Sequence, residues 1–307
     1  MTVLVSGSSG LIGTALLGAL AAEGREVVRL VRPGSGAGTG PRTGATVTWD
    51  PGRRTLDREA LRAAGPYEAV VHLAGTGVGD KRWSPARKAE ILHSRTDSTG
   101  LLVSALLACT PPPPVLVSAS AIGYYGDRGD EVLDEGAGRG AGFLADVVEA
   151  WEGATAPASE AGIRVVLLRT GLVLSPAGGV LGRLLPLFKW GIGGRIGPGT
   201  QYQSWIALDD EVAVIGRALA DDALRGPVNA VAPTPVTNAE LTTALSRALH
   251  RPAVLPVPSA ALRLGLGRQM ADEMLLASQR VSPAVLQAVD FPFRHTELDE
   301  ALASLLG

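Results

Sequence analysis

Three glycines near the beginning of the chain have the spacing of a phosphate-binding turn. Gly7, Gly10 and Gly13 lie in the segment GSSGLIG, directly after a short apolar run and before a run with helical periodicity. In such a turn, backbone N–H groups and the positive end of the helix face a pyrophosphate. The spacing is G-x-x-G-x-x-G and not the better-known G-x-G-x-x-G, so a glycine-rich turn without a ligand is the alternative. We predict a dinucleotide site here.

The second apolar run ends in an arginine where a carboxylate would favour NAD. A NAD site places Asp or Glu about 20 residues beyond the glycines, where it binds the ribose 2′-hydroxyl. No acidic residue occurs between Val27 and Val47, and Arg32 follows Val31 at the expected position. A guanidinium there pairs with a 2′-phosphate. The sequence therefore favours NADP(H) over NAD(H), and a solvated surface arginine is the alternative.

Residues at the end of a third apolar run would lie beside the same ligand. Leu73, Ala74 and Gly75 are small or apolar and follow the run AVVHL, so an adenosine or ribose can lie against their backbone. His72 precedes them inside the run. We interpret His72 as structural and not as a catalytic base.

The predicted site residues must be positioned by alternating strands and helices. The apolar patterns predict both kinds of element, and the alternation predicts an α/β fold with a Rossmann-type, doubly wound parallel sheet. The predicted strands are Thr2–Val5, Val27–Val31, Ala45–Trp49, Ala69–Leu73, Val115–Ser118 and Arg164–Leu168, and the helices are Leu11–Ala22, Ser84–Ala108 and Phe143–Ala161.

The pattern changes after Arg169. We expect residues 1–170 to form the NADP-binding domain and residues 171–307 a smaller, mostly helical C-terminal substrate lobe, with a soft boundary across which elements interleave. Helical patterns cover Ala207–Leu219, Asn238–His250 and Thr296–Leu306. The segment Gly34–Gly44 has low complexity and is expected to be a flexible loop.

Composition narrows the possible partners and the compartment. Hydrophobic residues form 46% of the 307 residues, charged residues form 19%, and the formal net charge is −2. This balance argues against a nucleic-acid partner, and no apolar stretch approaches the roughly 18 residues that span a bilayer. Cys109 is the only cysteine, which excludes an internal disulfide and fits a cytoplasmic protein. We expect a small-molecule substrate and no metal site, and leave the oligomeric state open.

Five segments together resemble a known family. GSSGLIG, VVHLAG, SASAIGYYGDRG, RTGLVL and MADEMLLASQRVSPAVLQAVDFPF are similar to the extended, atypical short-chain dehydrogenase/reductases. More narrowly, they resemble the "epimerase family" group, which ends in a small domain of unknown function, here residues 252–307. The resemblance covers nearly the whole chain. It implies dinucleotide contacts from Gly7, Ser8, Ser9, Gly10, Leu11, Ile12, Val31, Arg32, Leu73 and Ala74, from Glu90 and Arg95 on a helix, and from Leu172 at the nicotinamide end. For Glu90 and Arg95, an exposed salt bridge on the helix is the alternative.

One departure from the superfamily concerns its chemistry. The superfamily uses a serine and a Tyr-x-x-x-Lys pair, but no such pair occurs here, and the expected helix offers only Phe143 and Val147. Ser118 and Ser120 occupy the region of the superfamily serine, where they would bind nicotinamide, orient a carbonyl, or merely cap a strand. We take Ser120 and Tyr124 as the candidate catalytic residues.

Other residues offer weaker candidates. The spacing of Tyr124 and Arg128 mimics the lost pair, but it lies in a glycine-flanked loop and is best treated as coincidence. Tyr202, Gln203 and Trp205 are predicted to form a substrate wall. The alternative for Trp205 is a place in the core.

Two functions fit these observations. The favoured one is an NADP(H)-dependent oxidoreductase or epimerase acting on a small carbonyl or sugar-like substrate. The alternative is a catalytically silent NADP(H)-binding sensor or regulator, supported by the missing tyrosine–lysine pair. Members of this family have also been described as cell-division inhibitors.

Overall fold

An eight-stranded sheet forms the centre of the molecule, in the order β12-β8-β6-β5-β1-β2-β3-β4. The computed structural model describes residues 2–34, 44–253 and 255–307, so most of the predicted Gly34–Gly44 loop lies outside the described residues. Every pair in the sheet is parallel except β3–β4. The strands are β1 Thr2–Ser6, β2 Glu26–Val31, β3 Thr46–Asp50, β4 Thr55–Leu56, β5 Ala69–His72, β6 Val115–Ala121, β8 Arg164–Thr170 and β12 Gly226–Ala230.

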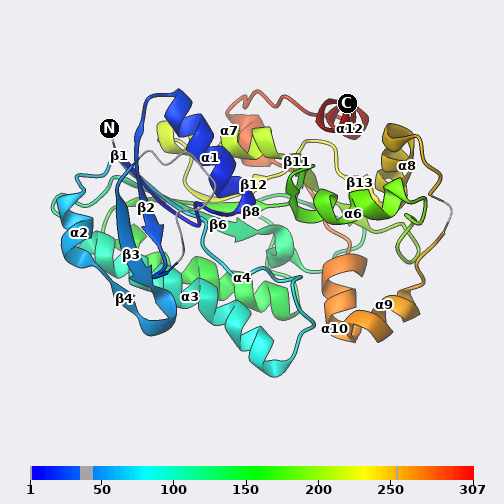
Figure 1. Cartoon of the computed structure of the whole chain (residues 1–307), viewed down its shortest axis with the longest axis horizontal. Helices are drawn as coiled ribbons and strands as arrows, with labels where there is room; N and C mark the ends of the chain where they lie inside the picture. Colours follow the sequence, from blue (N-terminus) through cyan, green and yellow to red (C-terminus); the bar gives the residue numbers. More distant parts are fainter. Residues whose placement is uncertain (1, 35–43, 254) are drawn as a thin grey trace.

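Helices cover both faces of this sheet (Figure 1). Helices α1 (Leu11–Ala22) and α7 (Leu208–Ala220) pack on one face, and α3 (Pro85–Leu107) and α4 (Phe143–Gly153) on the other. The side chains of β1 alternate between two cores: Val3 and Val5 belong to the α1/α7 side, and Leu4 to the α3 side. Burial on both faces explains why the strands are continuous apolar runs. The predicted doubly wound fold is confirmed.

Most predicted elements differ from the observed ones by one or two residues at an end, and two differ by more. The predicted helix Phe143–Ala161 is broken, because α4 ends at Gly153 and α5 spans Ala156–Glu160. Pro157 lies in the first turn of α5, where its missing N–H is tolerated; within a continuous helix it would remove a hydrogen bond. Strand β6 continues past Ser118 to Ala121 because it pairs with β8 along that whole length. Ser120 is therefore inside a strand.

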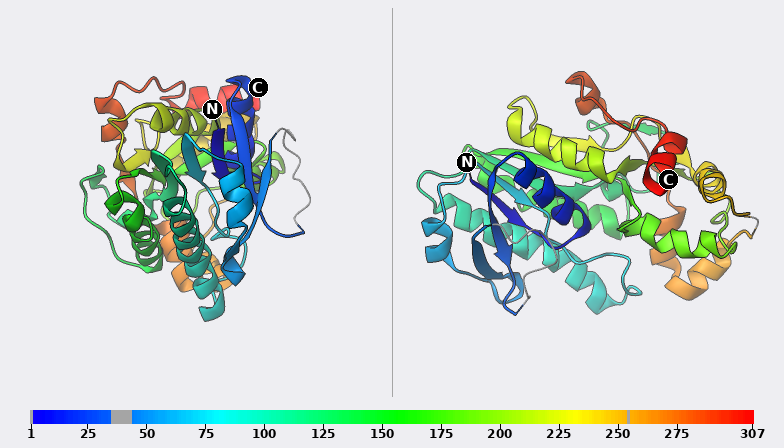
Figure 2. Two further views of the ribbon diagram at one scale, coloured as in Figure 1. Left: turned by 90° about the vertical axis from the view of Figure 1, so that its left-hand side faces the viewer. Right: turned by 45° about the horizontal axis from the view of Figure 1, so that its top comes forward.

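The C-terminal part of the chain builds a further core, beyond the two on the faces of the sheet, at one end of the sheet (Figure 2). Helices α6 (Gly179–Lys189), α8 (Asn238–Leu249) and α12 (Leu298–Leu306) share this core. Helix α7 and strand β12 also follow residue 170. Strand β12 is nevertheless part of the sheet, and α7 packs on one face of it. The remaining elements are short: α2 Arg58–Ala63, β7 Val132–Leu133, β9 Leu172–Ser175, β10 Tyr202–Gln203, β11 Trp205–Ala207, β13 Val236–Thr237, α9 Ser259–Leu266, α10 Arg268–Ala271, β14 Arg280–Val281 and α11 Ala284–Ala288, with helical turns η1 Pro51–Arg53, η2 Ile122–Tyr125 and η3 Asp272–Leu276.

Two kinds of feature do not occur in the described part of the chain. None of its helices is both long enough and apolar enough to cross a bilayer. Nor does it contain a group of three or more His, Cys, Asp or Glu side chains able to hold a metal ion.

Candidate functional site

The glycine turn joins β1 to α1 and approaches its neighbours closely at two positions. Gly7 has φ +70°, and a Cβ built on it would lie 2.6 Å from the carbonyl carbon of Leu73. A Cβ on Gly13 would lie 2.3 Å from the Gly7 carbonyl oxygen. Only glycine permits this packing of the turn against the end of β5 and the first turn of α1. The predicted turn is therefore present with the geometry of a dinucleotide site.

Gly10 has a different role in the turn. It is the N-cap residue of α1, with φ −77°, an angle open to any residue. A Cβ there would lie 3.4 Å from the Gly7 oxygen, so the fold has room for it. No side chain caps α1, and its first turn carries no acid. The N–H groups of the first turn are therefore left for an anion at the positive end of the helix.

A cavity of about 810 Å³ opens beside this turn. It lies where the strand order reverses on either side of β1, at the carboxyl ends of the strands, which is where open α/β sheets bind ligands. The predicted residues that line it are Gly7, Ser8, Ser9, Gly10, Val31, Arg32, Leu73, Ala74, Gly75 and Glu90. Residues that line it without having been predicted include Thr14, Leu17, Arg29, Trp49, Asp50, Pro51, Gly52, Asp80, His93 and Asp97.

Some residues that were predicted to contact the cofactor do not line this cavity. Leu11 lies next to Gly178 and Gly179 of the C-terminal part, and Ile12 packs against the core between α1 and the sheet. Leu172 packs against the C-terminal core. Ser118 is fully buried within β6, and its hydroxyl donates to the Ala119 carbonyl. None of these side chains lines the described cavity, so their predicted roles are not supported by it.

Of the two charged residues on α3 that were predicted to face the cofactor, Glu90 lines the cavity and Arg95 does not. Glu90 lines the cavity and pairs with Arg87, whose Nη1 lies 2.7 Å from its Oε2. Arg95 instead donates from Nη1 to the carbonyls of Thr76 and Ile91, each at 3.1 Å. Burial, and to a smaller extent Arg87, lowers the pKa of Arg95 to about 10. Arg95 therefore stays charged at neutral pH and supports the segment that follows β5.

That segment is also tied to the C-terminal part. Asp80 lines the cavity, and its Oδ1 lies 2.7 Å from Nη2 of Arg183 on α6. Nη1 of Arg183 donates to the Gly79 carbonyl at 2.9 Å. Helix α6 thus holds one wall of the cavity.

His72 is part of the core, as its place in a strand predicts. Its Nδ1 lies 2.6 Å from the Ser6 hydroxyl and its Nε2 lies 3.0 Å from that of Thr99. Burial lowers the pKa of His72 to about 4, so the ring is neutral at physiological pH. It joins β5 to β1 and α3, with no exposed face for a substrate.

A polar cluster lies around Ser120 and Tyr124. The Ser120 hydroxyl donates to Oε1 of Glu152 at 2.6 Å. Glu152 also accepts two hydrogen bonds from Arg169, both at 2.8 Å. The Arg169 guanidinium stacks on the Tyr124 ring, 3.6 Å from its centroid. Arg169 is buried and the Glu152 side chain is only 12% exposed, so hydrogen bonds within the protein hold this ion pair.

The neighbouring tyrosines differ in how their hydroxyls are bound. The Tyr125 hydroxyl donates to Asn229 at 2.7 Å and accepts from Arg169 at 3.1 Å, and burial raises its pKa. No hydrogen bond from a described residue reaches the Tyr124 hydroxyl. Of the two neighbouring hydroxyls, that of Tyr124 is therefore the one without a hydrogen-bond partner among the described residues. Glu152 and Arg169 were not predicted; the one signal for them was an arginine inside the apolar strand RVVLLRT.

The structure corrects the predicted substrate wall at Trp205. Its side chain is only 1% exposed, and its indole N–H donates to the Thr234 carbonyl at 2.9 Å, so it belongs to the C-terminal core. Tyr202 and Gln203 are half-buried. Arg280 lies over the Tyr202 ring, and Gln203 accepts a hydrogen bond from Asn238.

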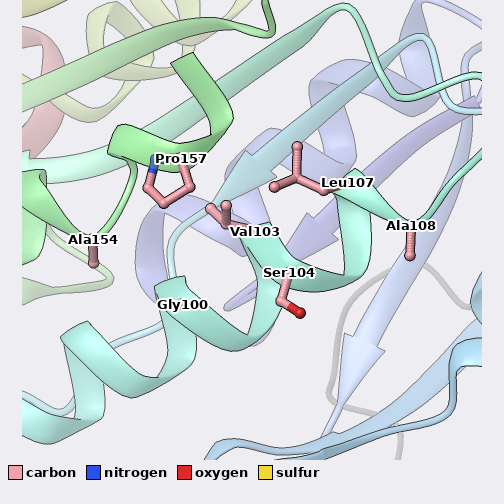
Figure 3. Close-up of a pocket in the computed structure, with 7 residues that line it drawn as sticks. All are labelled: Gly100, Val103, Ser104, Leu107, Ala108, Ala154 and Pro157. Atoms are coloured by element: carbon pink, nitrogen blue, oxygen red, sulfur yellow. The ribbon is translucent and has the colours of Figure 1, made fainter. Parts of the chain in front are cut away.

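A second hollow lies between α3 and α5 and carries no comparable chemistry (Figure 3). Its volume is about 390 Å³. The hydroxyl of Ser104 is its only side-chain polar group, and that oxygen accepts a hydrogen bond from Arg58. Its other lining residues are Gly100, Val103, Leu107, Ala108, Ala154 and Pro157.

The parallel sheet, the glycine turn and the cavity at the strand reversal define a Rossmann-type dinucleotide-binding protein. Its sequence matches a model of the NAD dependent epimerase/dehydratase family over residues 3–230. The chain belongs to this family. Residues 257–305 match a domain of unknown function, DUF1731, which falls within the predicted C-terminal segment 252–307. The resemblance inferred from the motifs is confirmed.

Individual relatives are similar to this protein over nearly the whole chain. Epimerase family protein MT2273 of Mycobacterium tuberculosis (strain CDC 1551 / Oshkosh) is 46% identical over 300 residues, covering 98% of this chain and 96% of that protein. The crystal structure of human epimerase family protein SDR39U1 (isoform 2) with NADPH is 33% identical, covers 100% of this chain and 99% of that one, and has a TM-score of 0.87. UDP-glucose 4-epimerase of Thermus thermophilus in complex with NAD, at 21% identity and a TM-score of 0.79, shares the fold.

The choice between the two dinucleotides can be tested at Arg32. This residue is exposed at the edge of the cavity, at the end of β2. We expect Arg32→Ala to weaken NADPH binding by about 10- to 150-fold and NADH binding little, because a charge-assisted pair with a phosphate contributes on the order of 1.5–3 kcal/mol. Titration of both cofactors measures this. Equal affinities in the unmutated protein would contradict the assignment.

Proposed function

We propose that this protein is an NADP(H)-dependent oxidoreductase or epimerase-like enzyme that acts on a small carbonyl or sugar-like substrate. The observation that carries the proposal is the cluster of Ser120, Glu152, Arg169 and Tyr124. It lies at the carboxyl ends of β6 and β8, on the edge of the sheet where the cofactor cavity opens. The cluster places a tyrosine ring, whose hydroxyl has no hydrogen-bond partner among the described residues, against the arginine of an ion pair, and binding a dinucleotide alone does not require this.

The cofactor assignment rests on this chain's own residues and on its relatives. The glycine turn, the uncapped start of α1 and the acid-free end of β2 fit a dinucleotide with a 2′-phosphate. The human relative has been solved with NADPH. When bound, NADPH would supply the hydride that reduces a carbonyl, or NADP⁺ would accept one from an alcohol.

The residues of the cluster would then hydrogen-bond and protonate the substrate's oxygen. As a carbonyl carbon gains hydride, its oxygen gains negative charge and needs a donor and then a proton. The Tyr124 hydroxyl is the available donor, and the Arg169 guanidinium that stacks on its ring holds that ring in place. Ser120 has a single proton, which it donates to Glu152. Its oxygen can still accept a hydrogen bond from a substrate hydroxyl, so in this proposal Ser120 orients the substrate and Tyr124 supplies the proton.

A substrate panel tests this function. NADPH oxidation is followed with small aldehydes, ketones and keto sugars, and NADP⁺ reduction with the matching alcohols. We expect turnover with at least one class, and loss of that turnover in Tyr124→Phe. Tight NADPH binding without turnover on the whole panel would instead favour a sensor or regulator.

A further inference from the structure

Arg29 is a buried arginine that lines the cofactor cavity, and its side chain makes no hydrogen bond or ion pair with a described residue. It lies on β2, is 5% exposed, and lines the cavity together with Thr14 and Leu17 of α1. Its Nε has no hydrogen-bond partner among the described residues. None of the ion pairs between described residues includes it, and Asp50, the last residue of β3, pairs with Arg53.

The lack of an ion pair distinguishes Arg29 from the other buried arginines, although the Nε of Arg87 also has no hydrogen-bond partner among the described residues. Arg87 is 6% exposed and pairs with Glu90, and Arg169 is 3% exposed and pairs with Glu152. Removing a guanidinium from water is costly unless an anion or hydrogen-bond acceptors replace the water. The protein supplies such partners to Arg87 and Arg169. For Arg29, the partner must come from what enters the cavity.

The position of Arg29 indicates which anion this is. The pyrophosphate belongs at the uncapped start of α1, beside Gly10. Arg29 lies instead on β2, three residues before Arg32, on the strand whose end approaches the ribose 2′ position. The sequence has no acid between Val27 and Val47 to repel a second phosphate. A phosphate monoester carries a charge of about −1.5 to −2 at neutral pH, which two guanidinium groups can balance.

We propose that Arg29 and Arg32 together bind the 2′-phosphate of NADP(H), Arg29 from inside the cavity and Arg32 from its exposed edge. The proposal rests on the NADP(H) binding in the proposed function and adds a second specificity residue to it. Because Arg29 is shielded from water, its pairing with the phosphate is screened less than that of Arg32. Arg29 therefore contributes the larger share of the preference for NADP(H) over NAD(H).

Binding measurements on Arg29→Met test this, with Arg53→Met as the matched control. Arg53 lies beside the cavity residues Pro51 and Gly52, but its side chain is 83% exposed. We expect Arg29→Met to weaken binding of NADPH and of 2′,5′-ADP by about 100-fold or more, and that of NADH and 5′-AMP by less than about threefold. Arg53→Met should change none of these by more than about threefold. Arg29→Lys, which keeps the charge without the planar fork, should give an intermediate loss.

Thermal unfolding of the ligand-free protein supplies a second readout. A structural arginine would lower the melting temperature when replaced, whereas removal of an unpaired buried charge should leave it unchanged or raise it. NADPH binding by folded Arg29→Met within about twofold of the unmutated protein would overturn the proposal while leaving the proposed function intact. If the unmutated protein does not prefer NADPH to NADH, both fail. Unfolding of Arg29→Met together with full 2′,5′-ADP binding by Arg29→Lys would assign Arg29 to the fold alone.

Discussion

Gly10→Val is expected to abolish measurable NADPH binding while leaving the protein folded. The backbone of Gly10 is in an ordinary extended conformation, and an added Cβ would make only a van der Waals contact with the Gly7 oxygen. The two methyl groups would instead occupy the space before the first turn of α1 that a pyrophosphate needs. We expect an affinity loss of at least about 1000-fold, roughly 4 kcal/mol, by titration.

Two other glycines serve as controls for this variant. Gly18 lies within α1 with open space around it, so Gly18→Ala should bind NADPH normally. Gly7 has φ +70° and lies against the Leu73 backbone, so Gly7→Ala should destabilise the fold itself. If folded Gly10→Val binds NADPH as well as Gly18→Ala does, the turn is not the phosphate site.

The second large effect is expected at Tyr124. Tyr124→Phe should lower kcat for any carbonyl reduction by about 10²- to 10³-fold, the usual cost of removing one donor to a developing oxyanion. NADPH affinity should change little, because Tyr124 does not line the described cavity. Ser120→Ala should lower kcat within the same range, since substrate orientation and proton supply both depend on this cluster.

The controls for this prediction follow from the ion pair. Replacing Glu152 would leave Arg169 buried without its partner and cost about 3–5 kcal/mol of stability, so it cannot isolate the chemistry. Removing the Tyr124 hydroxyl leaves that pair intact. Undiminished turnover in the double variant Ser120→Ala/Tyr124→Phe would exclude this cluster as the catalytic site.

The cofactor end of the site was predictable because its signals are local. The glycine turn and Arg32 each follow a strand directly, so position along the chain determines position in space. The segment after β3 could have been found in the same way, because Pro51-Gly52 follows an apolar strand. Arg29 escaped notice because an arginine inside a strand has no spacing motif, and its meaning depends on the lack of a partner.

The cluster around Ser120 and Tyr124 was less predictable from the sequence because it depends on tertiary contacts. Ser120 meets Glu152 across 32 positions, and Glu152 meets Arg169 across 17. No periodic pattern encodes either pairing. For Trp205 the sequence left a substrate wall and a place in the core as alternatives, and the structure places it in the core; an indole that contacts a ligand and one that fills a core have the same sequence signature.

The last strand of the sheet, β12, comes from the C-terminal half of the chain, and this determines where the protein can be divided into fragments. Strand β12 pairs with β8 along Gly226–Ala230, so a fragment ending near residue 170 would leave β8 as a bare edge. The C-terminal segment is also joined to the first half, since β14 pairs with β7 and Glu135 accepts from the backbone N–H of Asn229 and Val285. Residues 171–307 therefore cannot be exchanged between relatives as a cassette. A chimaera that keeps this fold must take its crossover points outside β12 and must carry β7 and β14 from the same parent.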